Sequence, residues 1–103
     1  MTKRKRQGTL HSVLGPIEVV YVDVIRDDAG AVVEDALGYF SGGRRLIQIL
    51  NGQHPAQEAH TLRHEWIHVA LWDSGATNLL SDVTTEVLCD VLATALITVP
   101  LPC

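Results

Sequence analysis

The first half of the chain alternates short β-branched segments with glycine-containing turns. Ile17–Ile25 reads IEVVYVDVI and follows a Gly-Pro pair, so it predicts a strand. Two further segments, 36–41 and 45–50, are separated by Gly42-Gly43 and predict a β-hairpin. A shorter strand is expected at Leu10–Leu14. Together these segments indicate a small antiparallel sheet of three to four strands.

The second half of the chain has the spacing and end signals of helices. A proline in the first turn favours a helix over residues 55–73, with Gly75 just past its end. Ser81 is a good N-cap for a second helix, which should run to about Thr98 and stop before Pro100. Apolar residues lie on most sides of this second helix: Val83, Val87, Leu88, Val91, Leu92, Ala95, Leu96 and Ile97. Such a helix is either central to the core or covered by a partner.

Strands followed by helices are typical of an α+β domain. A length of 103 residues fits a single domain. We assign residues 9–103 to that domain and residues 1–8 to a flexible basic tail. The expected architecture is therefore a small N-terminal antiparallel sheet packed on two C-terminal helices.

The charge and the cysteine content limit the classes of binding partner and the cellular compartment that are expected. With a net charge of -4 and one basic run at Lys3–Arg6, no nucleic-acid partner is expected. Cys89 and Cys103 do not make a disulfide framework, and a reducing cytoplasm fits them best. The chain has neither a signal-peptide pattern nor a run of about 18 apolar residues, so no membrane partner is expected.

Residues 64–68 read His-Glu-Trp-Ile-His, which is the pattern H-E-x-x-H. Four helical residues advance by about 400°, so His64 and His68 share one face and can reach one zinc ion at about 2.0–2.1 Å. Glu65 lies about 100° round the helix, where it can take a proton from water at the metal. The alternative is a surface helix with incidental histidines. We predict zinc as the cofactor and Glu65 as the general base.

A catalytic zinc site needs a third protein ligand, and the second predicted helix offers two carboxylates. Glu86 and Asp90 share one face of this apolar helix, where burying them without partners would be costly. The preferred assignment makes Glu86 the third ligand and Asp90 the acceptor of a ligating imidazole's free N–H. The reverse assignment and solvated surface carboxylates stay open. Cys89 could ligate in principle, but the role of a small buried apolar residue is favoured.

Other residues near the motif carry weaker predictions. His60 is expected to be a plain surface histidine, with a rim residue or substrate contact as the alternative. Tyr39 is preferred as the group that stabilises the oxyanion, over three other candidates: His11, His54 and Arg63. Arg45–Leu50 is expected to be an edge strand beside the site, with free backbone groups that could hold an extended substrate.

The two motifs together resemble the gluzincin class of zinc peptidases. In that class, H-E-x-x-H is followed on the next helix by E-x-x-x-D. The resemblance implies the same roles as the residues themselves: three ligands, one general base and one aspartate that orients a histidine. These residues are, in that order, His64, His68, Glu86, Glu65 and Asp90.

A closer resemblance is to the ImmA/IrrE-type metallopeptidases of phages and mobile elements, and to small phage-encoded relatives. Residues 61–68, TLRHEWIH, are similar to the T-L-x-H-E entry of that family. Residues 86–93, EVLCDVLA, are similar to its E-x-x-A-N-x-F-A segment. Cys89 stands where the family has a small residue, and Asp90 stands where it has asparagine. The resemblance implies a minimal zincin-like fold.

These observations predict a zinc-dependent metalloendopeptidase with a protein or peptide substrate. The resemblance implies a phage or mobile-element regulator as that substrate. One alternative is a non-catalytic, zinc-stabilised binding module, and another is an antirepressor that binds a partner without cutting it. Glu65 argues against the binding module, since a structural zinc site needs no base. The antirepressor stays open, and it is distinguished by whether the partner is bound intact or cut. The oligomeric state is left open.

Overall fold

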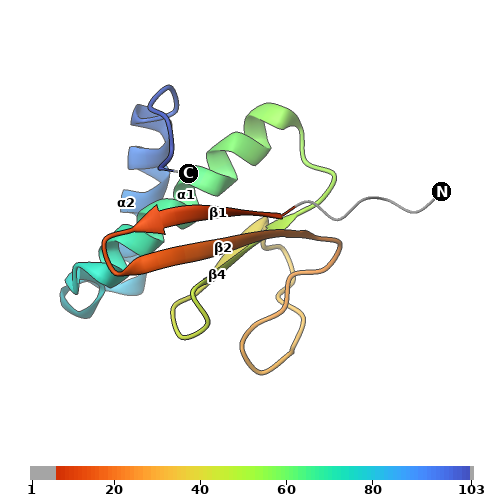
Figure 1. Cartoon of the computed structure of the whole chain (residues 1–103), viewed down its shortest axis with the longest axis horizontal. Helices are drawn as coiled ribbons and strands as arrows, with labels where there is room; N and C mark the ends of the chain where they lie inside the picture. The colour runs from red at the N-terminus through yellow and green to blue at the C-terminus, as the bar shows by residue number, and fades with distance from the viewer. Residues whose placement is uncertain (1–6, 103) are drawn as a thin grey trace.

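A four-stranded sheet and two helices make up the fold in the computed structural model, which describes residues 7–102 (Figure 1). The elements in chain order are β1 (Gln7–Ser12), β2 (Gly15–Val22), β3 (Gly38–Ser41), β4 (Leu46–Leu50), α1 (Pro55–Asp73), the 3-10 helix η1 (Ala76–Leu79) and α2 (Asp82–Ala95). The α+β class is therefore confirmed. Residues 1–6 of the expected basic tail lie outside the described residues, and residues 7 and 8 belong to β1.

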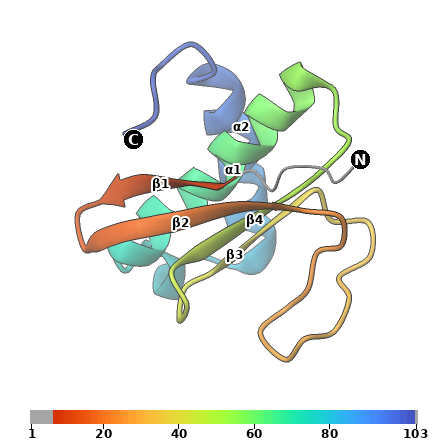
Figure 2. The same cartoon turned by 45° about the vertical axis from the view of Figure 1, so that its right-hand side comes forward.

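The sheet has the strand order β1-β2-β4-β3. The expected hairpin is confirmed, because β3 and β4 pair in antiparallel fashion, as do β1 and β2. The prediction of a wholly antiparallel sheet is wrong, because β2 and β4 run parallel. Between them the chain passes through the long segment 23–37, which projects beyond the sheet (Figure 2). This crossover puts β3 at the edge and β4 inside, so the predicted edge strand is corrected to β3.

The core lies between the sheet and α1. Its fully buried members are Ile17, Ile47, Ile49 and Val69, so alternate residues of β2 and β4 meet one face of the helix. The isoleucines and valines that predict the strands are thus also the residues that fill this layer. α2 packs on the opposite side of α1 from the sheet (Figure 1).

The first helix has the bounds that its end signals predict. Pro55 occupies its first position, where a missing N–H is tolerated. The Nδ1 atom of His54 accepts a hydrogen bond from the Ala56 N–H at 3.1 Å and caps the helix. The helix ends at Asp73, and Gly75 follows in a left-handed conformation with φ of 81°.

The second helix begins as predicted but is less buried than expected. The Ser81 hydroxyl accepts the Thr84 N–H at 3.1 Å, and the helix ends at Ala95, short of Thr98. Three side chains of α2 are buried (Thr85, Cys89 and Ala93), whereas Val83, Val87 and Val91 are exposed. The helix is therefore not central to the core. Within residues 7–102, neither helix has both the length and the apolar character that crossing a membrane requires.

An ion pair joins the hairpin turn to the end of α1. Arg45 adopts a left-handed conformation with φ of 50°, and its guanidinium donates to both carboxylate oxygens of Asp73, at 2.9 and 3.1 Å. The Ser12 hydroxyl also donates to Asp73, and Arg45 donates to the Gly15 carbonyl at 3.2 Å. The pair therefore ties the β1–β2 turn and the β3–β4 turn to one helix end.

We expect Asp73→Asn to lower the free energy of unfolding by about 1 kcal/mol at neutral pH, because Arg45 loses its charged partner yet still reaches solvent. Arg45 holds the pKa of the Asp73 carboxyl below its usual range, so the wild-type pair stabilises the fold above about pH 4 and loses that contribution as pH falls through the lowered pKa. Denaturant titrations at several acidic pH values should show a shallower loss of stability in the variant. The control is Glu18→Gln, an exposed carboxylate of β2. Parallel pH profiles for wild type and Asp73→Asn would contradict the assignment.

Candidate metal centre

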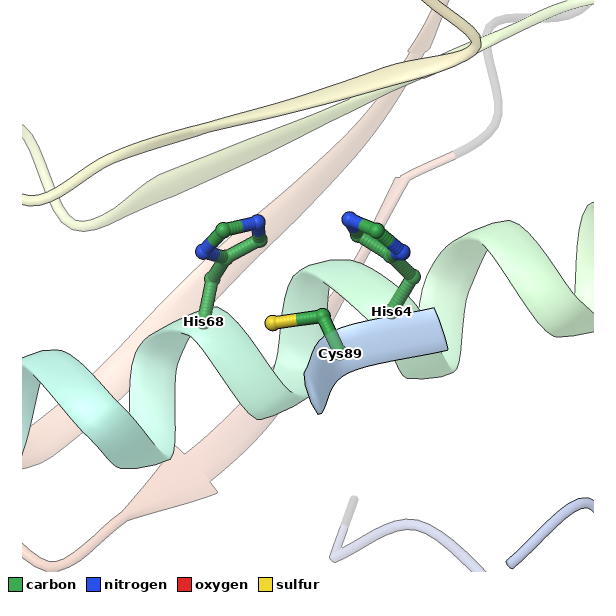
Figure 3. Close-up of side chains that lie close together, drawn as sticks. All are labelled: His64, His68 and Cys89. Atoms are coloured by element: carbon green, nitrogen blue, oxygen red, sulfur yellow. The ribbon is translucent and has the colours of Figure 1, made fainter. Parts of the chain in front are cut away.

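The two histidines of the H-E-x-x-H motif lie one turn apart on α1, as their spacing predicts. Their ring centroids are 5.0 Å apart, and their side chains are 13% and 20% exposed. Figure 3 shows the imidazoles of His64 and His68 side by side on the helix, with Cys89 of α2 next to them. The site is therefore built from facing surfaces of the two helices.

Glu86 lies across both imidazoles. Its Oε1 atom is 2.8 Å from Nε2 of His68, and its Oε2 atom is 3.1 Å from Nε2 of His64. Two imidazole nitrogens and a carboxylate thus converge on one place. Imidazole nitrogen and carboxylate oxygen are ligands that zinc accepts.

Asp90 contacts the other nitrogen of the same ring. Its Oδ1 atom lies 2.6 Å from Nδ1 of His64. An ionised carboxylate only accepts hydrogen bonds, so in the contact with Asp90 the His64 ring donates through Nδ1, which leaves Nε2 as the nitrogen that a metal cation could occupy. The Nδ1–H donated to Asp90 fixes the ring's orientation. The arrangement fits Glu86 as a ligand and Asp90 as a positioning residue.

The sequence predicts a cost of burial for Glu86 and Asp90, but the carboxylate that the structure buries is Glu65. The Glu86 and Asp90 side chains are 58% and 64% exposed, so solvent reaches both. Glu65 is only 6% exposed. Burial raises the pKa of Glu65 to about 7, and the charges of Glu86 and Asp90 add to that rise, whereas His64 opposes it. A carboxyl with a pKa near neutrality can both take up and release a proton.

β3 forms the wall against which Glu65 is buried. The Phe40 N–H donates a hydrogen bond to the Glu65 carboxylate, which lowers the pKa of that group slightly against the effect of burial. Gly38 passes so close that an added Cβ would lie 3.0 Å from Cγ of Glu65 and 2.9 Å from the Thr61 methyl group. The absence of a side chain at Gly38 therefore makes room for Glu65.

Burial also affects the second histidine. It lowers the pKa of His68, and the neighbouring His64 acts in the same direction, whereas Glu86 opposes both. A lowered pKa favours the neutral imidazole, which is the form that binds metals.

A cavity of about 490 Å³ opens beside these residues, between β3 and the two helices. Its lining includes the carboxylates of Glu65, Glu86 and Asp90, but no lysine or arginine among the described residues. Three carboxylates around two imidazoles give the floor of the cavity an acidic character. A cation is the natural partner for such a group.

Cys89 offers a second way to complete the donor set. Its Sγ atom and one ring nitrogen from each of His64 and His68 all lie within 4.8 Å of one another (Figure 3). The side chain is fully buried and packs against Ile67 and Ala93, as expected of a small apolar residue. Burial raises the pKa of its thiol to about 12, with the charge of Glu86 adding to the effect. Its closeness to the imidazoles was missed, because helical spacing does not fix how α2 faces α1.

Tyr39 and His60 both line the cavity. The His60 Nε2 atom lies 3.2 Å from the Thr94 hydroxyl, so His60 has a partner on α2 as well as a place in the cavity lining. Burial raises the pKa of the Tyr39 hydroxyl, and the charges that act on it are those of Asp28, Asp27 and Arg44. None of these is a residue of the metal centre, so a role for Tyr39 in stabilising an oxyanion stays a prediction.

The three other candidates for that role do not line the cavity. His54 caps α1. Arg63 donates to the Leu96 and Val99 carbonyls at 3.1 and 2.8 Å, beyond the end of α2. His11 lies on β1, across the sheet from β3. Arg63 and His54 therefore serve helix ends.

Comparison of the chain with models of known protein families finds no match, and comparisons with curated proteins and with solved structures find none either.

We expect one equivalent of zinc to bind, and we expect Asp90→Asn to weaken that binding about 10–100-fold, because a ligating imidazole loses a charged acceptor. Glu86→Ala should weaken it further, because a donor is lost. Competition titrations against a chromophoric chelator measure both effects. The control is Glu18→Gln, which removes one negative charge far from the site. Equal zinc affinity in wild type and Glu86→Ala would rule out Glu86 as a ligand.

Cobalt spectroscopy should decide between Glu86 and Cys89. Because the Glu86 carboxylate contacts Nε2 of both histidines, we expect cobalt-loaded protein to lack a near-ultraviolet sulfur-to-metal charge-transfer band. Cys89→Ala should then bind cobalt as the wild type does. A strong band that disappears in Cys89→Ala would make the thiolate a ligand instead.

Proposed function

We propose that this protein is a zinc-dependent peptidase that hydrolyses peptide bonds. The observation that carries the proposal is the convergence of Glu86 on Nε2 of both His64 and His68, with the buried Glu65 on the next helix position. A structural metal site has no use for that fourth residue, whereas hydrolysis needs a base beside the metal. The resemblance of both motifs to gluzincins supports the same conclusion.

The residues divide the work between metal binding and proton transfer. A bound zinc ion would supply a Lewis acid that activates water and polarises the scissile carbonyl. Glu65 takes the proton of the attacking water and delivers it to the leaving amine. Asp90 holds the His64 ring in place through Nδ1. The wall formed by β3 holds the Glu65 side chain in a fixed orientation and shields it from most of the solvent.

The free edge of β3 provides a place for an extended substrate. Leu37 accepts a hydrogen bond from the Leu50 N–H, so alternate residues from Leu37 onward face β4. Gly38 and Phe40 therefore direct their backbone groups to the open side, where Glu65 already meets the Phe40 N–H. A peptide added as a further strand would lie along the cavity, with its backbone beside the metal centre.

The substrate itself is proposed from the resemblance alone. ImmA/IrrE-type metallopeptidases act in phages and mobile elements, and a regulator from such an element is the protein substrate we propose. The cytoplasm is the compartment in which that substrate would be met. A peptide assay that does not presuppose the sequence of the regulator is therefore the right first test.

A non-catalytic module is the second candidate, and one observation favours it. The Cys89 Sγ atom lies within 4.8 Å of a ring nitrogen of each histidine, and a fourth protein ligand would make a closed, structural zinc site. The exposed valines of α2 would then engage a partner, as a zinc-stabilised binding module or an antirepressor requires. The cobalt experiment above separates this closed site from an open one.

Glu65→Gln tests the proposed function. The variant should keep its zinc affinity, because Glu65 is not a ligand, and should lose cleavage by about 10²–10⁴-fold, because the proton acceptor is gone. The assay is mass-spectrometric detection of products from a mixed peptide library with zinc-loaded protein. Removal of zinc by a chelator should abolish cleavage, and added zinc should restore it.

Glu18→Gln is the matched control, since it changes the same chemical group on an exposed face of the sheet. It should cleave like the wild type. Undiminished cleavage by Glu65→Gln would refute the mechanism. Absence of any cleavage by zinc-loaded wild type, across the whole library, would favour the binding module.

A further inference from the structure

The cavity has an aromatic wall at one end that the proposed chemistry does not use. Trp72 lies one helical turn beyond His68, in the same row of α1 as both histidines. It lines the cavity and remains 50% exposed, although tryptophan is the largest aromatic side chain. Large aromatic surfaces left open beside a catalytic centre are typical of binding sites for apolar groups.

Two neighbours hold the indole in place. Phe40 of β3 meets it edge to face, with ring centroids 6.2 Å apart and an interplanar angle of 85°. Gly42 also lies directly against the indole, where an added Cβ would overlap the ring. Trp72 is thus seated on the hairpin by a residue without a side chain, and part of its surface stays open to the cavity.

The other end of the cavity carries more polar groups. His60 and Gln57 line it there, one and about two turns before His64 on α1, beside Asp35, Ala36 and Leu37 from the segment that leads into β3. The cavity therefore changes from polar to aromatic along the axis of α1, and the metal centre lies between the two ends. A substrate that fills it would meet different chemistry on the two sides of the scissile bond.

Antiparallel pairing with β3, the slightly more stable of the two pairings, would determine which side of the bond meets Trp72. Gly38 lies against Glu65, and Gly42 lies against Trp72, so β3 runs in the same direction as α1. A peptide added antiparallel to β3 would run the opposite way, with its amino side over Trp72. Four helical residues rise about 6 Å, and two residues of an extended strand span about 6.6 Å. Trp72 therefore faces a side chain one or two residues from the cut.

We propose that Trp72, supported by Phe40 and Gly42, forms an apolar subsite that selects a large apolar or aromatic side chain one or two residues on the amino side of the scissile bond. The proposal rests on the proposed peptidase function and names the class of peptide that the site takes. Trp72 is a specificity residue here, and it takes no part in metal binding or proton transfer.

Peptide binding to the Glu65→Gln protein loaded with zinc tests the subsite without requiring turnover. The probes are blocked alanine hexapeptides that carry one phenylalanine at successive positions, with the all-alanine peptide for comparison. Calorimetric titration should give about tenfold tighter binding for the best phenylalanine peptide, as expected for burying part of one aromatic side chain. A second substitution, Trp72→Ala, should remove that preference, whereas Trp72→Phe should keep most of it.

Two controls protect this comparison. Val13→Ala removes an apolar side chain that is 90% exposed in the β1–β2 turn, and it should leave the preference unchanged. Zinc affinity should be equal in the Trp72→Ala and Trp72→Phe proteins, which shows that the metal centre is intact in both. The proposed subsite would be overturned if the preference survived the Trp72→Ala substitution. It would also be overturned if the Glu65→Gln protein without a second substitution bound all the peptides equally.

Cleavage by the zinc-loaded wild type then locates the phenylalanine relative to the cut. The expected products carry it one or two residues on the amino side. Products that carry it only on the carboxyl side would overturn the proposal, and cleavage without preference would do the same while leaving the peptidase function intact. Selective binding without any cleavage would support the subsite and count against the peptidase function.

Discussion

The contact between α1 and α2 is the constraint on which the site depends. Cys89 and Ala93 are small enough for the two helix backbones to approach, and Ile67 packs against both. That approach sets the Glu86 carboxylate against the two imidazoles. α1 alone presents a pair of histidines and a base, so the donor set is complete only when the second helix is docked. A larger side chain at position 89 would separate the helices and the donors together.

The sheet contributes through its edge strand. Because β4 pairs in parallel with β2, the hairpin turns β3 outward over α1, where Gly38 and Phe40 enclose Glu65. The burial that raises the pKa of Glu65 is thus a result of strand order. The same edge supplies backbone groups along the cavity. Strand topology and acid–base chemistry are connected at this one place.

Local signals in the sequence are enough to predict the helices and half of the site. Pro55 and Ser81 mark helix starts, and the spacing of His64 and His68 defines a shared face. The parallel pairing of β2 and β4 has no such signal, because it joins strands separated by the long segment 23–37. Residue spacing within α2 likewise cannot tell how that helix turns toward α1.

The position of one further residue of the cavity can be predicted from its spacing in the sequence. Trp72 follows His68 at the same four-residue interval that joins the two histidines, so its place in the row is predictable from spacing alone. Gly38 lies inside the predicted strand segment and Gly42 begins the turn after it, and only the packing shows that each leaves room for a neighbour on α1. Such close approaches depend on the final fit of layers, which sequence patterns do not describe.

α2 docks by one face only, with Val83, Val87 and Val91 left in solvent. The residue that would close the metal site therefore belongs to the less firmly anchored of the two helices. The proposed zinc ion would bind the docked arrangement and gain nothing from an undocked one, so its occupancy and helix docking would form a single linked equilibrium. The ion would stabilise the domain as well as take part in catalysis. Its removal would loosen α2 first and leave the sheet intact for longer.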